Sequence, residues 1–195
     1  MSRIGVFGGT FDPIHVGHLV TAVNVRHELS LDEVLLVVAN DPWQKTGHQL
    51  VTPAQDRLAM VTAAIENVKG ISASDVEIRR GGASYTADTL RDLQRERPDA
   101  ELFLILGSDA AAGLPTWERV DEVRALSTLV VVTRPGFDGS AAPAGWPAVQ
   151  VEVPRLEVAS SDLRRRFADG RPLDWLVPEA AVRLIRERGL YAPRG

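Results

Sequence analysis

Four short and almost entirely apolar runs recur along the chain, with segments of helical character between them. The runs cover residues 4–7, 33–39, 101–106 and 128–133. Strands that helices cover on both faces have this composition, because neither face of such a strand meets water. The alternation predicts an α/β protein with a doubly wound parallel sheet. Such sheets bind ligands at the carboxyl ends of their strands, so we expect the site to follow Phe7, Ala39, Leu106 and Thr133.

Apolar residues at helical spacing predict two helices in the first third of the chain. The first has Val16, Leu19, Val20 and Val23 on its buried face, and the second has Leu58, Val61, Ile65 and Val68 there. A capping box that starts at Thr52, with Pro53 at the first helical position, predicts where the second helix begins.

The later elements are predicted from shorter signals. Residues 76–79 give a weaker strand prediction, which Gly81 and Gly82 interrupt, and Thr86 is the expected N-cap of a helix that carries Leu90 and Leu93. Residues 149–153 predict a last strand, and two helices end at Gly170 and Gly189. We expect a single domain over residues 1–195, in which residues 155–195 form a C-terminal helical subdomain.

The absence of cysteine narrows the chemistry. Disulfides, thiolate metal sites and cysteine nucleophiles are excluded, and the cytoplasm is the expected compartment. A formal net charge of −4 gives no general attraction to nucleic acid or to an anionic membrane, so we expect neither as a partner. No apolar run approaches the length of a membrane span, and the N-terminus enters the first predicted strand without a signal region.

The segment GGTFDPIHVGH, residues 8–18, lies between the first predicted strand and the first predicted helix. Its glycines let backbone amides approach a phosphate closely, Thr10 offers a hydroxyl, and the helix start adds amides and a positive dipole end. His15 and His18 are three residues apart, so both can point at one anion. The pattern indicates a phosphate site that is neither a Walker loop nor a GxGxxG fingerprint. The alternatives are histidines that bind nothing and two metal ligands without a third.

A second segment, VASSDLRRR at residues 158–166, places hydroxyls and a guanidinium at another helix start. Ser160 and Ser161 stand where amides are free, and Arg164 follows one turn later, so all three can converge on phosphate oxygens. A capped surface helix with solvated arginines is the alternative.

Together the two segments resemble the signatures of the nucleotidylyltransferase superfamily, HxGH and ISSTxIR. The resemblance runs from Gly8 to Arg166 and implies a Rossmann-like nucleotidyltransferase fold that binds ATP, with Ala159 replacing a serine of the usual motif. It implies ATP contacts at Gly8, Gly9, Thr10, Phe11, Gly17, Ser160 and Ser161, and catalytic roles for His15, His18, Lys45 and Arg164. Lys45 follows Trp43 and Gln44, where relatives more often have proline and histidine, and a solvated surface lysine is its alternative role.

Two further segments, residues 84–90 and 107–117, resemble those that hold the acceptor in the nicotinate-mononucleotide adenylyltransferase branch. The resemblance implies that amides of Tyr85 and Thr86 receive the nicotinate carboxylate, that Trp117 stacks on the pyridine ring, and that Asp109 binds a ribose hydroxyl. Trp117 as a core aromatic and Thr86 as a simple N-cap are the alternatives. Asp12 is assigned to the substrate as well, where it holds magnesium or ribose, unless it only shapes the turn.

The implied reaction is attack of the acceptor phosphate of nicotinate mononucleotide on Mg-ATP, with Mg²⁺ bound mainly by the phosphates and no metal site built by the protein. A homo-oligomer is compatible with the sequence. Rival assignments are a phosphopantetheine adenylyltransferase, a cytidylyltransferase, a non-catalytic nucleotide-binding module and an NAD-dependent oxidoreductase. The missing GxGxxG pattern disfavours the oxidoreductase.

Overall fold

The computed structural model describes residues 1–42, 51–136, 142–143 and 145–192. Six parallel strands form one sheet in the order β3-β2-β1-β4-β5-β6. The strands are β1 (Ser2–Gly9), β2 (Glu33–Val38), β3 (Ile71–Ser74), β4 (Ala100–Gly107), β5 (Thr128–Thr133) and β6 (Ala148–Glu152). Because the chain runs outward from β1 through β2 to β3 and then returns to β4 on the other side, the strand order reverses between β1 and β4.

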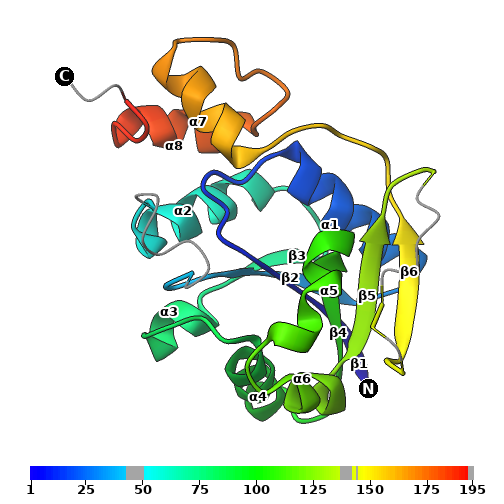
Figure 1. Cartoon of the computed structure of the whole chain (residues 1–195). Coiled ribbons are helices and arrows are strands. Elements are labelled where there is room, and N and C mark those ends of the chain that lie inside the picture. The colour runs from blue at the N-terminus through cyan, green and yellow to red at the C-terminus, as the bar shows by residue number, and fades with distance from the viewer. Residues whose placement is uncertain (43–50, 137–141, 144, 193–195) are drawn as a thin grey trace.

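Helices cover both faces of the sheet, as Figure 1 shows. They are α1 (Val16–Glu28), α2 (Ala54–Ile65), α3 (Val76–Arg80), α4 (Thr86–Glu96), α5 (Ser108–Ala112), α6 (Val120–Leu126), α7 (Ser160–Ala168) and α8 (Glu179–Glu187), with a 3-10 turn η1 (Leu114–Thr116). In β2, Val34, Leu36 and Val38 belong to one hydrophobic core, whereas Leu35 and Val37 belong to the other. The alternation follows from the period of two in a strand, and it confirms the predicted doubly wound sheet.

The C-terminal helices share the core of the sheet. Leu163 of α7 and Ile185 of α8 are fully buried and belong to the same cluster as the residues of α1 and α2. Figure 1 places α7 and α8 beyond α2, on the side of the sheet that α1 covers. No helix in the described part of the chain is long and apolar enough to span a membrane.

Several local predictions are wrong. Residues 76–79 lie in helix α3, and the strand precedes them at Ile71–Ser74. The N-caps of α2 and α4 are Pro53 and Tyr85, one residue from the predicted Thr52 and Thr86, and neither makes a side-chain cap.

The buried face of α1 also differs from its predicted stripe. Ala22 and Val25 are its buried residues, while Val23 is 45% exposed. Of the predicted stripe, Leu19 packs against the core while only partly buried, and Ala22 and Val25 continue this face at intervals of three residues along α1. Its first turn faces the glycine-rich loop described next.

Candidate active site

The glycine-rich loop, residues 8–15, carries the chain from the end of β1 into α1. Phe11 adopts a left-handed backbone conformation with φ of 49° and is only 1% exposed. Its ring lies against Gly9, where an added Cβ would come within 2.7 Å of the ring. A bulky residue at positive φ is unusual, and such conformations persist where the surrounding packing enforces them. Phe11, which is predicted to contact ATP, therefore lies inside the core, and its ring supports the backbone of the loop at Gly9.

His15 and His18 come together at the start of α1, as their spacing predicts. Their rings stack with centroids 3.7 Å apart, and the Phe11 ring meets His18 edge-on at 5.0 Å. The backbone amide of His15 donates to Nδ1 of His18 at 3.2 Å. Because Nδ1 accepts, a neutral His18 carries its proton on Nε2. Gly17 lets the pair pack closely, since a Cβ there would come within about 3.1 Å of the His15 ring.

The environment of His15 favours the neutral imidazole. Its side chain is 7% exposed, and burial lowers its pKa to about 4. Nδ1 of His15 has no hydrogen-bond partner among the described residues. A buried nitrogen of this kind is costly to leave unpaired, so it marks a place where a ligand or water would satisfy the ring.

Side chains from the C-terminal part of the chain donate hydrogen bonds to backbone carbonyls of the glycine-rich loop. Ser160 Oγ donates to the carbonyl of Pro13 at 2.9 Å, and Arg164 Nη1 donates to the carbonyl of Asp12 at 2.6 Å. The amide of Val16 donates to the carbonyl of Leu176 at 3.0 Å. The two predicted phosphate-site segments therefore meet, and Ser160 and Arg164 are already bonded to the loop. Ser161 is exposed on the first turn of α7.

Asp12 is buried and engaged on both carboxylate oxygens. Tyr191 donates its hydroxyl to one oxygen at 2.5 Å, and the amide of Thr52 donates to the other at 3.3 Å. Burial and the neighbouring Asp12 charge raise the pKa of Tyr191, so Tyr191 stays a donor. Of the roles considered for Asp12, this geometry favours shaping of the turn over contact with magnesium or ribose.

A cavity of about 240 Å³ opens beside the glycine-rich loop, at the carboxyl ends of β1, β2 and β4. Its floor is apolar, with Val6, Val37 and Leu104 from the sheet, and Gly8, Gly9 and Thr10 form one wall. Tyr85, Thr86 and Trp117, which the resemblance assigns to the acceptor, also line this cavity. Asp109 is exposed on α5 and does not line this cavity, although its neighbour Ala110 does. The site lies where the strand order reverses, as expected for this sheet.

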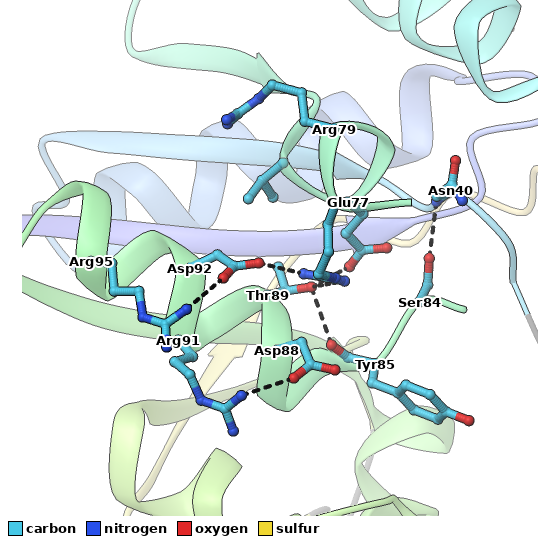
Figure 2. A network of polar contacts seen from close by, with 12 residues as sticks. Asn40, Glu77, Arg79, Ser84, Tyr85, Asp88, Thr89, Arg91, Asp92 and Arg95 are labelled. Atoms are coloured by element: carbon cyan, nitrogen blue, oxygen red, sulfur yellow. Dashed lines mark hydrogen bonds and ion pairs between the residues drawn. The ribbon is translucent and has the colours of Figure 1, made fainter. Parts of the chain in front are cut away.

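The start of α4 faces the cavity with unpaired amides. Neither the Tyr85 amide nor the Thr86 amide donates to any described residue. Asp88, in the first turn of α4, receives two hydrogen bonds from Arg119 at 2.7 and 2.5 Å, and these lower its pKa. The Arg119 guanidinium also lies 6.0 Å from the centre of the Tyr85 ring. Figure 2 shows Asp88 and Tyr85 next to each other at this helix start.

Asp88 is not the only acidic residue near these amides. Glu77 and Glu118 also line the cavity. Glu77 is buried, accepts a hydrogen bond from the Thr89 hydroxyl at 2.6 Å, and has one oxygen without a partner among the described residues. Arg80 Nη2 donates to the same Thr89 hydroxyl at 3.3 Å, so Glu77 belongs to a network of polar and charged side chains. Figure 2 shows Glu77 and Thr89 in this network.

Sequence reasoning missed the residues that support the site. Arg57 of α2 is 1% exposed and donates to the carbonyl of Thr10 at 2.8 Å. One sequence signal could have found it, because Arg57 stands at helical spacing from Met60, Val61 and Ala64, all of them buried. Tyr191 and Glu77 carry no comparable signal. Lys45 lies outside the described residues.

The described residues contain no group of three or more histidine or acidic side chains placed to hold a metal ion. Among the residues that the structure describes, two side chains, His15 and Glu77, have buried polar atoms without a partner. Glu77 lines the cavity and His15 ends the glycine-rich loop beside it, and unsatisfied polar groups of this kind concentrate at functional sites.

Comparison with known proteins places this geometry in a family. The family model described as cytidylyltransferase-like matches residues 6–166. A Streptomyces coelicolor protein named "Probable nicotinate-nucleotide adenylyltransferase" is 48% identical, with 94% of this chain and 98% of that protein covered. A Corynebacterium kroppenstedtii protein of the same name is 46% identical over 99% of this chain and 92% of its own length.

The fold has close counterparts among solved structures. The Plasmodium falciparum nicotinic acid mononucleotide adenylyltransferase complexed with NaAD superposes with a TM-score of 0.79, covering 98% of each chain at 19% identity. At 19% identity this similarity shows the fold alone. The family is shown by the family model and by the relatives that are 46–48% identical in sequence. The chain belongs to the cytidylyltransferase-like family and, within it, groups with the bacterial nicotinate-nucleotide adenylyltransferases.

Proposed function

We propose that the protein transfers the adenylyl group of Mg-ATP to the phosphate of nicotinate mononucleotide, which yields nicotinate adenine dinucleotide and pyrophosphate for NAD biosynthesis. The observation that carries this proposal is that one segment, the glycine-rich loop, borders both the histidine pair and the apolar cavity. The glycine-rich loop, which leads into the histidine pair, also forms one side of the apolar cavity under α4. Two nucleotides bound on either side of that loop would meet at their phosphates.

The triphosphate is assigned to the start of α1. His15, His18, the amides of Gly8 and Gly9 and the dipole of α1 offer donors to an anion. Arg164 directs one nitrogen to the loop and would give its others to the leaving pyrophosphate, with Ser161 on the same helix. Lys45, which lies outside the described residues, is assigned to the same pyrophosphate. Magnesium enters as part of the Mg-ATP substrate. Because the described residues offer no cluster of metal ligands, phosphate oxygens are its expected partners.

The nicotinate ring is assigned to the cavity, with Trp117 against its face and its carboxylate at the Tyr85 and Thr86 amides. Arg119 and Arg80 offset the acids at this end of the cavity. A carboxamide in the same place would turn its NH₂ toward donors, which costs about 1–3 kcal/mol for the unpaired group. We therefore expect roughly tenfold or greater preference for nicotinate over nicotinamide mononucleotide.

The reaction needs positioning more than acid or base chemistry. The acceptor phosphate has a second pKa of about 6, so it is mostly dianionic at neutral pH and attacks without a general base. One phosphate oxygen forms a bond to the α-phosphorus of ATP while the bond to the pyrophosphate oxygen breaks. His18 would donate from Nε2 to the α-phosphate as charge redistributes, and His15, Lys45, Ser161 and Arg164 would hold the pyrophosphate that leaves.

Pyrophosphate release tests the proposal. The protein is incubated with Mg-ATP and, in turn, nicotinate mononucleotide, nicotinamide mononucleotide and phosphopantetheine, and with CTP in place of ATP. Release with the nicotinate acceptor and ATP, together with chromatographic identification of the dinucleotide, is the expected result. Binding of ATP without release in any combination would indicate a non-catalytic module and contradict the proposal.

The same proposal includes the cell compartment and partners. A cysteine-free chain with a net charge of −4 suits the cytoplasm, where both nucleotides occur, and offers no general surface for nucleic acid.

A further inference from the structure

Among the large, fully buried side chains in the described part of the protein, Arg57 is the only charged one. It projects from the first turn of α2, and each of its donor atoms meets a different backbone carbonyl. Nε donates to Thr52 at 2.7 Å, Nη1 to Thr10 at 2.8 Å and Nη2 to Asn40 at 3.1 Å. The helix face around it is apolar, with Met60 and Val61 below, so an apolar residue would suit the core as well.

Burial of this guanidinium is costly, and no carboxylate in the described part of the chain pairs with it directly. Unlike a methionine side chain, the Arg57 guanidinium is a rigid, planar group whose N–H donors point in fixed directions. Its nitrogens hold the three carbonyls in one fixed arrangement. The role of Arg57 therefore depends on which segments of the chain contain these three carbonyls.

Two of the three carbonyls belong to separate segments that follow the neighbouring strands β1 and β2. Thr10 belongs to the glycine-rich loop, and Asn40 follows β2 beside the α4 entry loop, residues 81–85. The Asn40 amide donates to Ser84 Oγ at 2.9 Å, and its side-chain nitrogen donates to the Gly82 carbonyl at 2.8 Å (Figure 2). The Ser84 amide returns a bond to the Asp41 carbonyl at 3.1 Å.

We propose that Arg57 is a positioning residue that fixes the glycine-rich loop and the α4 entry loop relative to each other, with Asn40 as the link between them. The inference rests on the proposed function, in which the first loop holds the nucleotide donor and the second holds the acceptor. In-line attack requires reacting atoms about 3–3.5 Å apart, and a shift of about 1 Å can cost on the order of 10²-fold in rate. Arg57 touches neither nucleotide in this scheme and acts through the two loops.

The first experiment compares Arg57→Met and Arg57→Lys with two controls, one on α2 and one at the end of α8 that contacts α2. Val61→Ala shortens a buried side chain one turn further along α2, and Arg188→Met breaks the ion pair with Asp56 beside Arg57. Turnover, thermal midpoint, and the separate dissociation constants of Mg-ATP and nicotinate mononucleotide are measured for each. The unaltered protein is assayed first, and its failure to release pyrophosphate would count against the proposed function rather than against Arg57.

We expect Arg57→Met to lower kcat by about 10²-fold, while the two separate dissociation constants change by less than about threefold. Arg57→Lys should recover part of kcat, because an ammonium donates to carbonyls without the planar fork. Both controls should keep kcat near the original value. The proposal is overturned if Val61→Ala, at an equal loss of thermal midpoint, loses as much kcat as Arg57→Lys, or if the Arg57 effect lies entirely in one dissociation constant.

A second experiment tests the link and does not depend on Arg57→Met being folded. Asn40→Ala removes the bond to Gly82 and should lower kcat by about tenfold with little change in either separate dissociation constant. Combined with Arg57→Lys, it should add little beyond the larger single effect, because residues of one network are not additive. Effects that multiply, or an Asn40→Ala protein with unchanged kcat, would show that the loops are not tied through Asn40.

Discussion

As pH is lowered, this protein should begin to lose stability at a higher pH than protonation of its carboxylates alone would cause. The reason is that His15 is buried as a neutral imidazole. Burial lowers the His15 pKa to about 4, from an ordinary value of 6.5. Between these two values the unfolded chain takes up a proton that the folded chain refuses, so the free energy of unfolding falls as pH falls. At about 1.36 kcal/mol for each pH unit, the full window amounts to about 3 kcal/mol. A loss of that size is a large part of a typical domain's stability.

Denaturant unfolding at a series of pH values between 7.5 and 4.5 measures this loss. His15→Gln should flatten the curve, whereas His27→Gln, which changes an exposed histidine near the end of α1, should leave it unchanged. Carboxylates with lowered pKa, such as Glu33 and Asp88, lose their contribution at lower pH and contribute equally to all three proteins. Parallel curves for the original protein and His15→Gln between pH 6.5 and 4.5 would refute the reasoning.

Four substitutions test the assigned roles. His18→Ala should lower turnover by about 10²–10³-fold and leave a folded protein, and near-normal turnover would remove His18 from the reaction. Arg164→Ala should weaken the binding of ATP and pyrophosphate more than the binding of the acceptor, and Arg165→Ala, at an exposed position, is the control. A change confined to the KM of the acceptor would contradict the role assigned to Arg164. Gly8→Ala should keep the thermal midpoint, since nothing lies within 4 Å of the added Cβ, but should raise the KM of ATP; unchanged kinetics would place the phosphates elsewhere. Thr86→Pro deletes one amide at a helix position that tolerates proline and should narrow the nicotinate preference, and an unchanged kcat/KM ratio for the two acceptors would refute the carboxylate site.

The sheet was predictable from sequence because its central strands are apolar on both faces. β3 was not, since it is an edge strand with only Ile71 buried, and its other three residues carry little apolar signal. The pattern VEIRR alternates like a strand, yet over five residues one helical turn can produce the same alternation. Short segments at the sheet edge are therefore decided by tertiary packing that the local sequence does not display.

The site was predictable only where its residues are close together along the chain. The histidine pair and the glycine-rich loop follow from one segment, and Tyr85, Thr86 and Trp117 from the family resemblance. The interior residues Arg57, Glu77 and Tyr191 depend on partners from 12 to 179 positions away. Asp12 illustrates the limit, because an acid in a phosphate-binding turn suggests a ligand contact until Tyr191 and Thr52 are seen to occupy it.

The bonds from the C-terminal helices to the glycine-rich loop have a consequence for how the protein is made. Ser160, Arg164 and Tyr191 reach residues that precede them by 147, 152 and 179 positions. At about 5–20 residues per second, a ribosome delivers these partners on the order of ten seconds or more after the loop has emerged. The nascent chain therefore carries the glycine-rich loop without these partners while the intervening residues are made, and non-local contacts of this range form late in folding. Competence to bind nucleotide should therefore appear only after residue 191 has left the ribosome.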